Sequence, residues 1–224
     1  MNNAGRLVCR QGGVRRMRME RVRNSSNLST MDIVCCGLFA AMIAIGAFIK
    51  IMIPVGAFEV TFSLQFFFAL LAGILLGERL GFLSVLAYLV IGLVGVPVFA
   101  HGGGLGYLLR PTFGFLIGFA AAAYLAGLIS GKFSKKGFLP FLLATFVGEM
   151  GYYACGLIYY FIMFNFVLTN GQSIGAAELF SVWFLSTVIP DFILCILASR
   201  LGMRLYPAFR NRIRIRVSPQ NKGA

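Results

Sequence analysis

The chain alternates long apolar runs with short polar segments. Each run approaches the ~20 apolar residues that a helix needs to cross the ~30 Å hydrocarbon core of a bilayer. A further apolar segment, 178–188, is expected to lie at the membrane interface or to lead into the last helix. The pattern predicts six transmembrane helices, at about residues 32–53, 62–77, 81–100, 112–130, 138–167 and 189–208.

Local signals predict where two of these helices begin. Ser29-Thr30-Met31-Asp32 has the form of a capping box and is expected to open the first helix. Pro190 is predicted to be the first residue of the last helix, because its missing N–H costs no hydrogen bond there. Asp191 would then lie in the first turn, where the helix dipole favours a negative charge.

The composition is typical of a membrane protein. Of the 224 residues, 59% are hydrophobic and 12% are charged, whereas a soluble domain carries about 25% charged residues. The sequence therefore predicts an all-α integral membrane protein. The five cysteines form no C-x-x-C pair and lie mostly in or beside apolar runs, which favours buried thiols over disulfides or metal ligands.

The net charge of +13 follows the positive-inside pattern of membrane proteins. If the N-terminus is cytoplasmic, every Lys and Arg except Lys50 and Arg110 falls in a predicted cytoplasmic segment or in the C-terminal part of the last predicted helix, toward the cytoplasm. Both termini are therefore predicted to be cytoplasmic. The expected parts are a basic N-terminal segment (1–30), a six-helix membrane domain (31–208) and a basic tail (209–224) that meets anionic lipid headgroups. No nucleic-acid-binding motif accompanies the tail, so no nucleic-acid partner is predicted.

Small residues recur on one face of the first predicted helix, at Gly37, Ala40, Ala44 and Ala47. Such a face lets two helices approach closely in lipid. Docking onto a partner subunit and packing within the chain both remain open for this face.

A glycine-rich loop separates the third and fourth predicted helices. Gly102, Gly103 and Gly104 follow the single histidine, His101, and precede Arg110. Since glycine permits φ > 0 and close approach of the backbone, the loop is predicted to fold over a ligand. No second histidine or cluster of Cys and carboxylates accompanies His101, so no metal site is predicted. The loop also lacks the P-loop pattern that binds nucleotides.

Few ionisable residues are predicted at membrane depth, where each is a functional hypothesis by default. Glu149 and Asp191 meet this description. Lys50 is expected to reach the interface with its long side chain, and Glu59 to lie in an outer loop. No nucleophile–base pair with the spacing of a catalytic motif is present, so no catalytic residue is predicted.

The stretch 62–119 resembles the BioY family of bacterial biotin transporters. Its specific marks are Phe-Ser-Leu-Gln (62–65), Pro-Val-Phe-Ala (97–100), the glycine loop and Pro-Thr-x-Gly (111–114). The resemblance implies a six-helix subunit that binds biotin at its outer side in a bacterial cell membrane. It also implies a first helix that docks onto the coupling protein of an energy-coupling-factor transporter, which two ABC-type ATPases drive with ATP. No cofactor is expected in this chain.

The chemistry of biotin suggests which residues bind it. Its apolar ring, ureido group and carboxylate call for an apolar lining, hydrogen-bonding groups and one cation. The predicted ligand contacts are Phe99, Tyr107 and Phe113 as lining, Asp191, Gln65 and His101 for the ureido group, Gly102, Gly103 and Gly104 in the loop, and Arg110 for the carboxylate.

One departure from the family concerns the last helix. Many relatives carry Asp-x-x-Lys there, whereas this chain has Asp191 followed by Leu194. Arg110 is predicted to take over from the missing lysine, and contact with headgroups or a salt bridge to Asp191 or Glu59 is the alternative. Two other functions stay open: binding of a different small vitamin or acid, and intramembrane catalysis by Glu149, Asp191 and His101.

Overall fold

The computed structural model describes residues 28–55, 58–133, 137–167 and 175–215. The chain divides into two units, 1–34 and 35–224. In the first unit, helix α2 (Thr30–Phe48) begins, and the backbone N–H of Ser29 donates to Oδ2 of Asp32 at 2.9 Å. This bond confirms the predicted capping signal.

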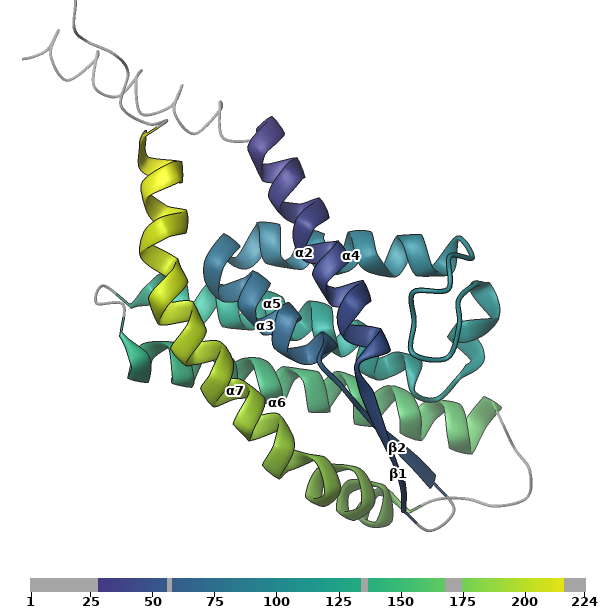
Figure 1. The fold of residues 1–224 in the computed structure, drawn as a ribbon. Helices are drawn as coiled ribbons and strands as arrows, with labels where there is room; N and C mark the ends of the chain where they lie inside the picture. The colour runs from purple at the N-terminus through teal and green to yellow at the C-terminus, as the bar shows by residue number, and fades with distance from the viewer. Residues whose placement is uncertain (1–27, 56–57, 134–136, 168–174, 216–224) are drawn as a thin grey trace, which may run out of the picture. The chain divides into compact units, whose positions relative to one another are not determined.

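Along its described residues, the second unit contains the rest of α2, a two-stranded hairpin, five further α-helices, one 3₁₀ helix and one π-helical turn (Figure 1). The elements are β1 (Lys50–Val55), β2 (Phe58–Ser63), α3 (Gln65–Leu76), α4 (Glu78–Leu93), the 3₁₀ helix η2 (Leu105–Leu109), α5 (Phe113–Lys132), α6 (Phe138–Ile162), the π-helical turn η3 (Met163–Val167) and α7 (Ala176–Ile215).

Helix α5 lies at the centre of this unit, packed mainly against α6 and also against α3 and α4 (Figure 1). Glycines make these close approaches possible. A Cβ on Gly118 would lie 2.7 Å from the carbonyl oxygen of Tyr152 on α6, and a Cβ on Gly127 would collide with the backbone of Glu78 on α4. Gly118 and Gly127 therefore serve packing within the chain.

Each predicted span corresponds to a helix, but the helices differ in length. Thr30–Phe48, Phe113–Lys132 and Phe138–Val167 are long and apolar enough to cross a membrane, among the described residues. The 12-residue α3 is only about 18 Å long and the 16-residue α4 about 24 Å, at 1.5 Å per residue. Six complete membrane crossings therefore remain a prediction.

The predicted all-α fold class is confirmed, because the described residues are mainly helical, but the prediction that the first helix extends to residue 53 is wrong. Helix α2 ends at Phe48, and β1 pairs antiparallel with β2, from Lys50 opposite Ser63 to Val55 opposite Phe58. An apolar run does not by itself distinguish helix from strand. Here Pro54 cannot continue a helix, and the neighbouring isoleucines and valines favour extended backbone.

The third predicted helix is also too long. It ends at Leu93 rather than near residue 100, because Gly95 takes φ = +117° and Pro97 follows. The residues after Leu93 that were predicted to be helical join the glycine-rich loop instead. The connection from α4 to α5 therefore runs from Val94 to Thr112.

The predicted start of the last helix at Pro190 is wrong. Helix α7 begins at Ala176, so the apolar segment 178–188 is part of it and Pro190 lies inside it. Membrane helices tolerate internal proline, because neighbouring groups can satisfy the freed carbonyl. The helix also continues past residue 208 to Ile215. Most of the predicted basic segments, 1–27 and 216–224, lie outside the described residues.

Candidate ligand-binding pocket

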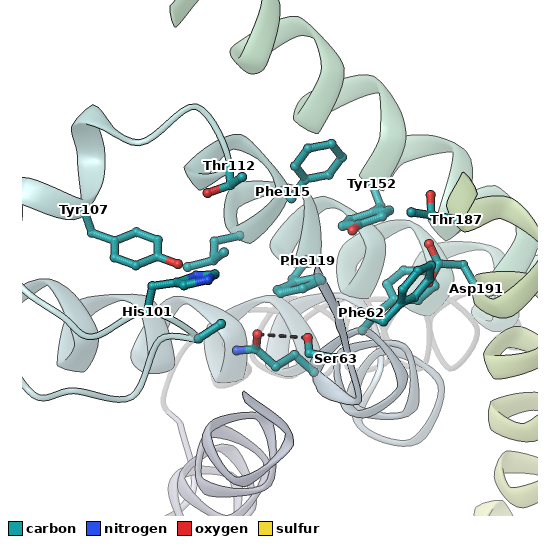
Figure 2. A pocket seen from close by; sticks show the side chains of 14 residues that line it. Phe62, Ser63, His101, Tyr107, Thr112, Phe115, Phe119, Tyr152, Thr187 and Asp191 are labelled. Atoms are coloured by element: carbon teal, nitrogen blue, oxygen red, sulfur yellow. Dashed lines mark hydrogen bonds between the residues drawn. The ribbon is translucent and has the colours of Figure 1, made fainter. Parts of the chain in front are cut away.

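A pocket with about 660 Å³ of empty space, part of it open to solvent, lies where the hairpin, the α4–α5 connection and helices α3, α5, α6 and α7 meet. It is lined by Phe62, Ser63, Gln65, Phe66, Ala100, His101, Tyr107, Thr112, Phe115, Leu116, Phe119, Tyr152, Thr187 and Asp191 (Figure 2).

Aromatic rings form the middle of the pocket. Phe119 of α5 and Tyr152 of α6 are stacked, with ring centroids 5.4 Å apart and an interplanar angle of 1°. Phe66 of α3 and Phe115 of α5 also contact Tyr152, at centroid distances of 4.8 and 5.3 Å. The result is an apolar wall against which a flat or thioether-containing ring can pack.

One end of the pocket is acidic and is held by a hydrogen-bond network between α6 and α7. The phenol of Tyr153 donates to Oδ2 of Asp191 at 2.7 Å and lies 2.6 Å from the hydroxyl of Thr187. Thr187 and Asp191 are four residues apart and therefore share one face of α7. Since Asp191 is only 5% exposed, this network fixes the direction in which its carboxylate faces the pocket.

The opposite end carries His101 and Tyr107 from the α4–α5 connection, as Figure 2 shows. Burial raises the pKa of the Tyr107 phenol above its ordinary value of 10.0, and the nearby Arg110 guanidinium opposes the rise. Tyr107 is therefore a neutral phenol at physiological pH, and its hydroxyl can donate a hydrogen bond to a ligand.

Gln65 is held at the pocket wall by its neighbours. Its Oε1 accepts a hydrogen bond from the Ser63 hydroxyl at 3.1 Å (Figure 2), and its Nε2 donates to the hydroxyl of Tyr88. The Tyr88 hydroxyl in turn donates to the carbonyl of Val98 at 3.2 Å. This chain of bonds links α3, α4 and the α4–α5 connection, which gives the start of α3 a fixed position beside the pocket.

The structure brings four of the predicted ligand contacts together in the lining: Gln65, His101, Tyr107 and Asp191. The other two predicted aromatic residues lie behind the lining. Phe99 and Phe113 are buried and pack against Tyr107, at centroid distances of 4.7 and 6.3 Å.

Arg110 lies at the rim. Its side chain is exposed, and its guanidinium carbon is 5.5 Å from the centre of the Tyr107 ring. It is therefore adjacent to a lining residue without being part of the lining itself.

The glycine loop folds back on its own chain. Phe99 and Gly102 exchange backbone hydrogen bonds, and the N–H of Gly104 donates to the carbonyl of Gly92 at 2.8 Å. Gly102 and Gly104 take φ of +110° and +96°, and a Cβ on Gly103 would collide with the carbonyl oxygen of Val96. These glycines are needed to shape the segment that presents Ala100 and His101 to the pocket.

The residues that the sequence did not single out are mainly aromatic. Phe66, Phe115, Phe119 and Tyr152 line the pocket, but the chain contains 23 phenylalanines and 8 tyrosines, with no local mark that separates these four residues from lipid-facing ones. Phe62 also lines the pocket; it belongs to the Phe-Ser-Leu-Gln mark but was not predicted as a ligand contact. Thr187 lies in the segment that was expected to precede the last helix. If the helix is assumed to be continuous, the spacing of four residues between Thr187 and Asp191 predicts that both lie on one face.

Glu149 does not line the pocket. It is fully buried on α6, where its Oε2 accepts a weak hydrogen bond from the Cys195 thiol at 3.5 Å and its Oε1 has no partner among the described residues. Glu149 and Cys195 therefore belong to the contact between α6 and α7 rather than to the ligand surface.

The small residues of α2 differ in exposure. Gly37 is exposed, Ala44 is half-buried, and Ala40 and Ala47 are buried at 4% and 1% exposure. Ala40 belongs to the hydrophobic core together with Ala69 and Leu70 of α3. Docking by this face remains a prediction, and part of the face is already used within the chain.

Comparison with known proteins places this chain in one family. The model of the BioY family matches residues 19–211. The probable biotin transporter BioY of Lysinibacillus sphaericus is 43% identical over 183 residues, covering 82% of this chain and 90% of the relative. The biotin transporter BioY of Thermotoga maritima is 34% identical, covering 78% and 95%. A crystal structure of the S-component for biotin from an ECF-type ABC transporter matches with a TM-score of 0.67 and 25% identity, over 80% of this chain and 94% of that one. The chain therefore belongs to the BioY family.

Proposed function

We propose that this chain is the biotin-binding membrane subunit of an energy-coupling-factor transporter and mediates biotin uptake across a bacterial cell membrane. The observation that carries the proposal is a pocket with an aromatic middle and different polar groups at its two ends, in a chain of this family. The named relatives are biotin transporters, and the matching structure is a biotin S-component.

Biotin is proposed to bind in one orientation. The ureido group has two N–H donors and one carbonyl acceptor, and the Asp191 carboxylate accepts hydrogen bonds through two oxygens. The ureido ring is placed at the Asp191 end, and the thioether ring against Phe119 and Tyr152. The acidic tail then points toward His101 and Tyr107, which lie at the other end (Figure 2).

Arg110 is proposed to bind the carboxylate at that end. Its contact with the Tyr107 ring keeps the guanidinium beside the lining, and a planar guanidinium can pair with a carboxylate through two parallel hydrogen bonds. Leu194, at the lysine position of many relatives, is half-buried and packs against the core.

Transport is proposed to depend on partners. This chain has no nucleotide-binding motif, so a transmembrane coupling protein and two ABC-type ATPases would supply the work of ATP hydrolysis. In this arrangement six helices cross the membrane, both termini are cytoplasmic, and the pocket opens outward.

An intramembrane enzyme is not supported. His101 and Asp191 lie at opposite ends of the pocket (Figure 2), and Glu149 is not part of its lining. The three residues therefore do not converge on one reacting atom. A different small vitamin or acid is the remaining alternative, because the aromatic wall alone does not distinguish biotin from other flat ligands.

Calorimetry on the purified chain tests the proposal. Biotin is expected to bind tightly without ATP or partner subunits, and unrelated vitamins are expected not to compete. Tighter binding of another vitamin than of biotin would replace the proposed ligand, and chemical conversion of bound biotin would restore the enzyme alternative.

A further inference from the structure

We propose that Lys50 supplies a second cation for the acidic end of the ligand and makes the pocket selective for a carboxylate. This inference rests on the proposed function and adds a residue to it. The sequence pattern predicts a Lys50 that only reaches the membrane interface, whereas the fold directs it to the pocket wall.

The backbone of Lys50 is held next to the lining by the hairpin. Lys50 is the first residue of β1 and pairs with Ser63 of β2, which lines the pocket. The N–H of Leu64 donates to the carbonyl of Ile49 at 3.2 Å, which closes the hairpin on the α3 side. Lys50 is therefore placed by strand register rather than by a flexible loop.

The side chain of Lys50 also contacts the lining, at a different residue from the one that its backbone pairs with. Its Nζ donates a hydrogen bond to the carbonyl of Ala100, 50 residues further along the chain, and Ala100 lines the pocket beside His101. An ammonium has three N–H donors, and this bond uses one of them. The remaining donors can bind a ligand oxygen while the bond to Ala100 holds the group in place.

The environment of Lys50 favours binding of an anion. Its side chain is half-buried, and a cation partly removed from water gains more from a counter-ion than a fully solvated one. Among the side chains that the structure describes, none forms an ion pair with it. The acidic residue of the lining, Asp191, is at the other end of the pocket from His101 (Figure 2). A ligand carboxylate beside Ala100 would supply the counter-ion.

Lys50 and Arg110 are expected to differ in how strongly they favour an acidic ligand over a neutral one. Arg110 is exposed, so solvent screens its charge. Lys50 is half-buried and is attached to the wall itself. We therefore expect Lys50 to account for more of the preference for an acid over a neutral ligand.

The test compares biotin with its uncharged amide by calorimetry, using full-length purified protein. The wild type is expected to bind biotin about 10- to 100-fold more tightly than the amide, the range set by a hydrogen bond to a charged group. Lys50→Met is expected to remove most of this preference by weakening biotin and sparing the amide. Lys50→Arg is expected to retain it.

Lys132→Met is the matched control. Lys132 is the last residue of α5, and the pocket lies at the first turn of that helix, at Thr112 and Phe115. At 1.5 Å per residue, Lys132 is about 26 Å from Phe115 along the helix. It is expected to leave both affinities unchanged.

Three results would overturn the inference: equal affinity of the wild type for biotin and the amide, equal weakening of both ligands by Lys50→Met, or no effect of that substitution. Because the first result needs no variant, the inference stays testable even if Lys50→Met does not fold. Failure of the wild type to bind biotin at all would instead contradict the proposed function, and the inference with it.

Discussion

The phenol of Tyr153 donates a hydrogen bond to Oδ2 of Asp191, joining α6 to α7 across 38 residues of sequence. Asp191 is 5% exposed and Tyr153 is 4% exposed. The bond therefore lies behind the pocket surface, where it orients the carboxylate that we propose for the ureido group. Tyr153 does not line the pocket, but it can change the affinity for the ligand by changing the orientation of Asp191.

Tyr153→Phe is expected to weaken biotin binding by about three- to tenfold, because a hydrogen bond typically contributes about 0.5–1.5 kcal/mol. Calorimetry measures the change. Tyr124→Phe is the control, since Tyr124 is 42% exposed on α5 and is not part of the lining. An unchanged affinity in Tyr153→Phe would show that Asp191 is oriented without this bond, or that it does not bind the ligand.

Gly103→Ala is expected to weaken biotin binding, because its Cβ would collide with the Val96 carbonyl and displace the segment that presents Ala100 and His101. Gly106→Ala is the control in the same connection, since a Cβ there meets nothing within 4 Å. Binding titrations on both variants, with thermal midpoints, check the prediction. It would be contradicted if the two substitutions had equal effects.

Arg110→Ala is expected to weaken biotin by up to about fivefold, or somewhat more with bidentate geometry, and its amide less, since a partly screened ion pair contributes about 0.2–1 kcal/mol at an exposed site. In the Arg110→Gly background, Leu194→Lys is expected to restore part of the affinity, because it recreates the Asp-x-x-Lys pattern and supplies another cation. Calorimetry with both ligands measures this. An equal loss of affinity for biotin and for the amide would show that Arg110 does not bind the carboxylate. Its role would then be to hold the ring of Tyr107, over which it lies.

Gly37→Leu is expected to spare biotin binding and weaken co-purification of the coupling protein, because Gly37 is exposed and a Cβ there meets nothing within 4 Å. Ala40→Leu is expected to lower the thermal midpoint of the isolated chain instead, since overpacking a core costs about 1–3 kcal/mol and Ala40 is 4% exposed. Intact assembly in Gly37→Leu would move the docking surface away from this face of α2.

The positions of the helices could be predicted from the sequence, because they depend on local properties of the chain. Burying the backbone in lipid favours a helix over most of a long apolar run, and the Ser29–Asp32 cap marks the start of α2. The segment 62–119 also contained the marks of the family to which the chain belongs. Errors arose where two local signals competed, as at Pro190, which favours a helix start yet lies inside α7.

The composition of the pocket was decided by tertiary structure. Gln65 and Asp191 stood out in the sequence because a polar residue in an apolar run is rare, whereas Phe66 and Phe119 are chemically the same as phenylalanines that face lipid. Only the packing of α3, α5 and α6 determines which rings face the cavity. The contacts from Tyr153 to Asp191 and from Lys50 to Ala100 join residues 38 and 50 positions apart. No local pattern specifies such pairs, because each depends on how separate helices and the hairpin are placed against one another.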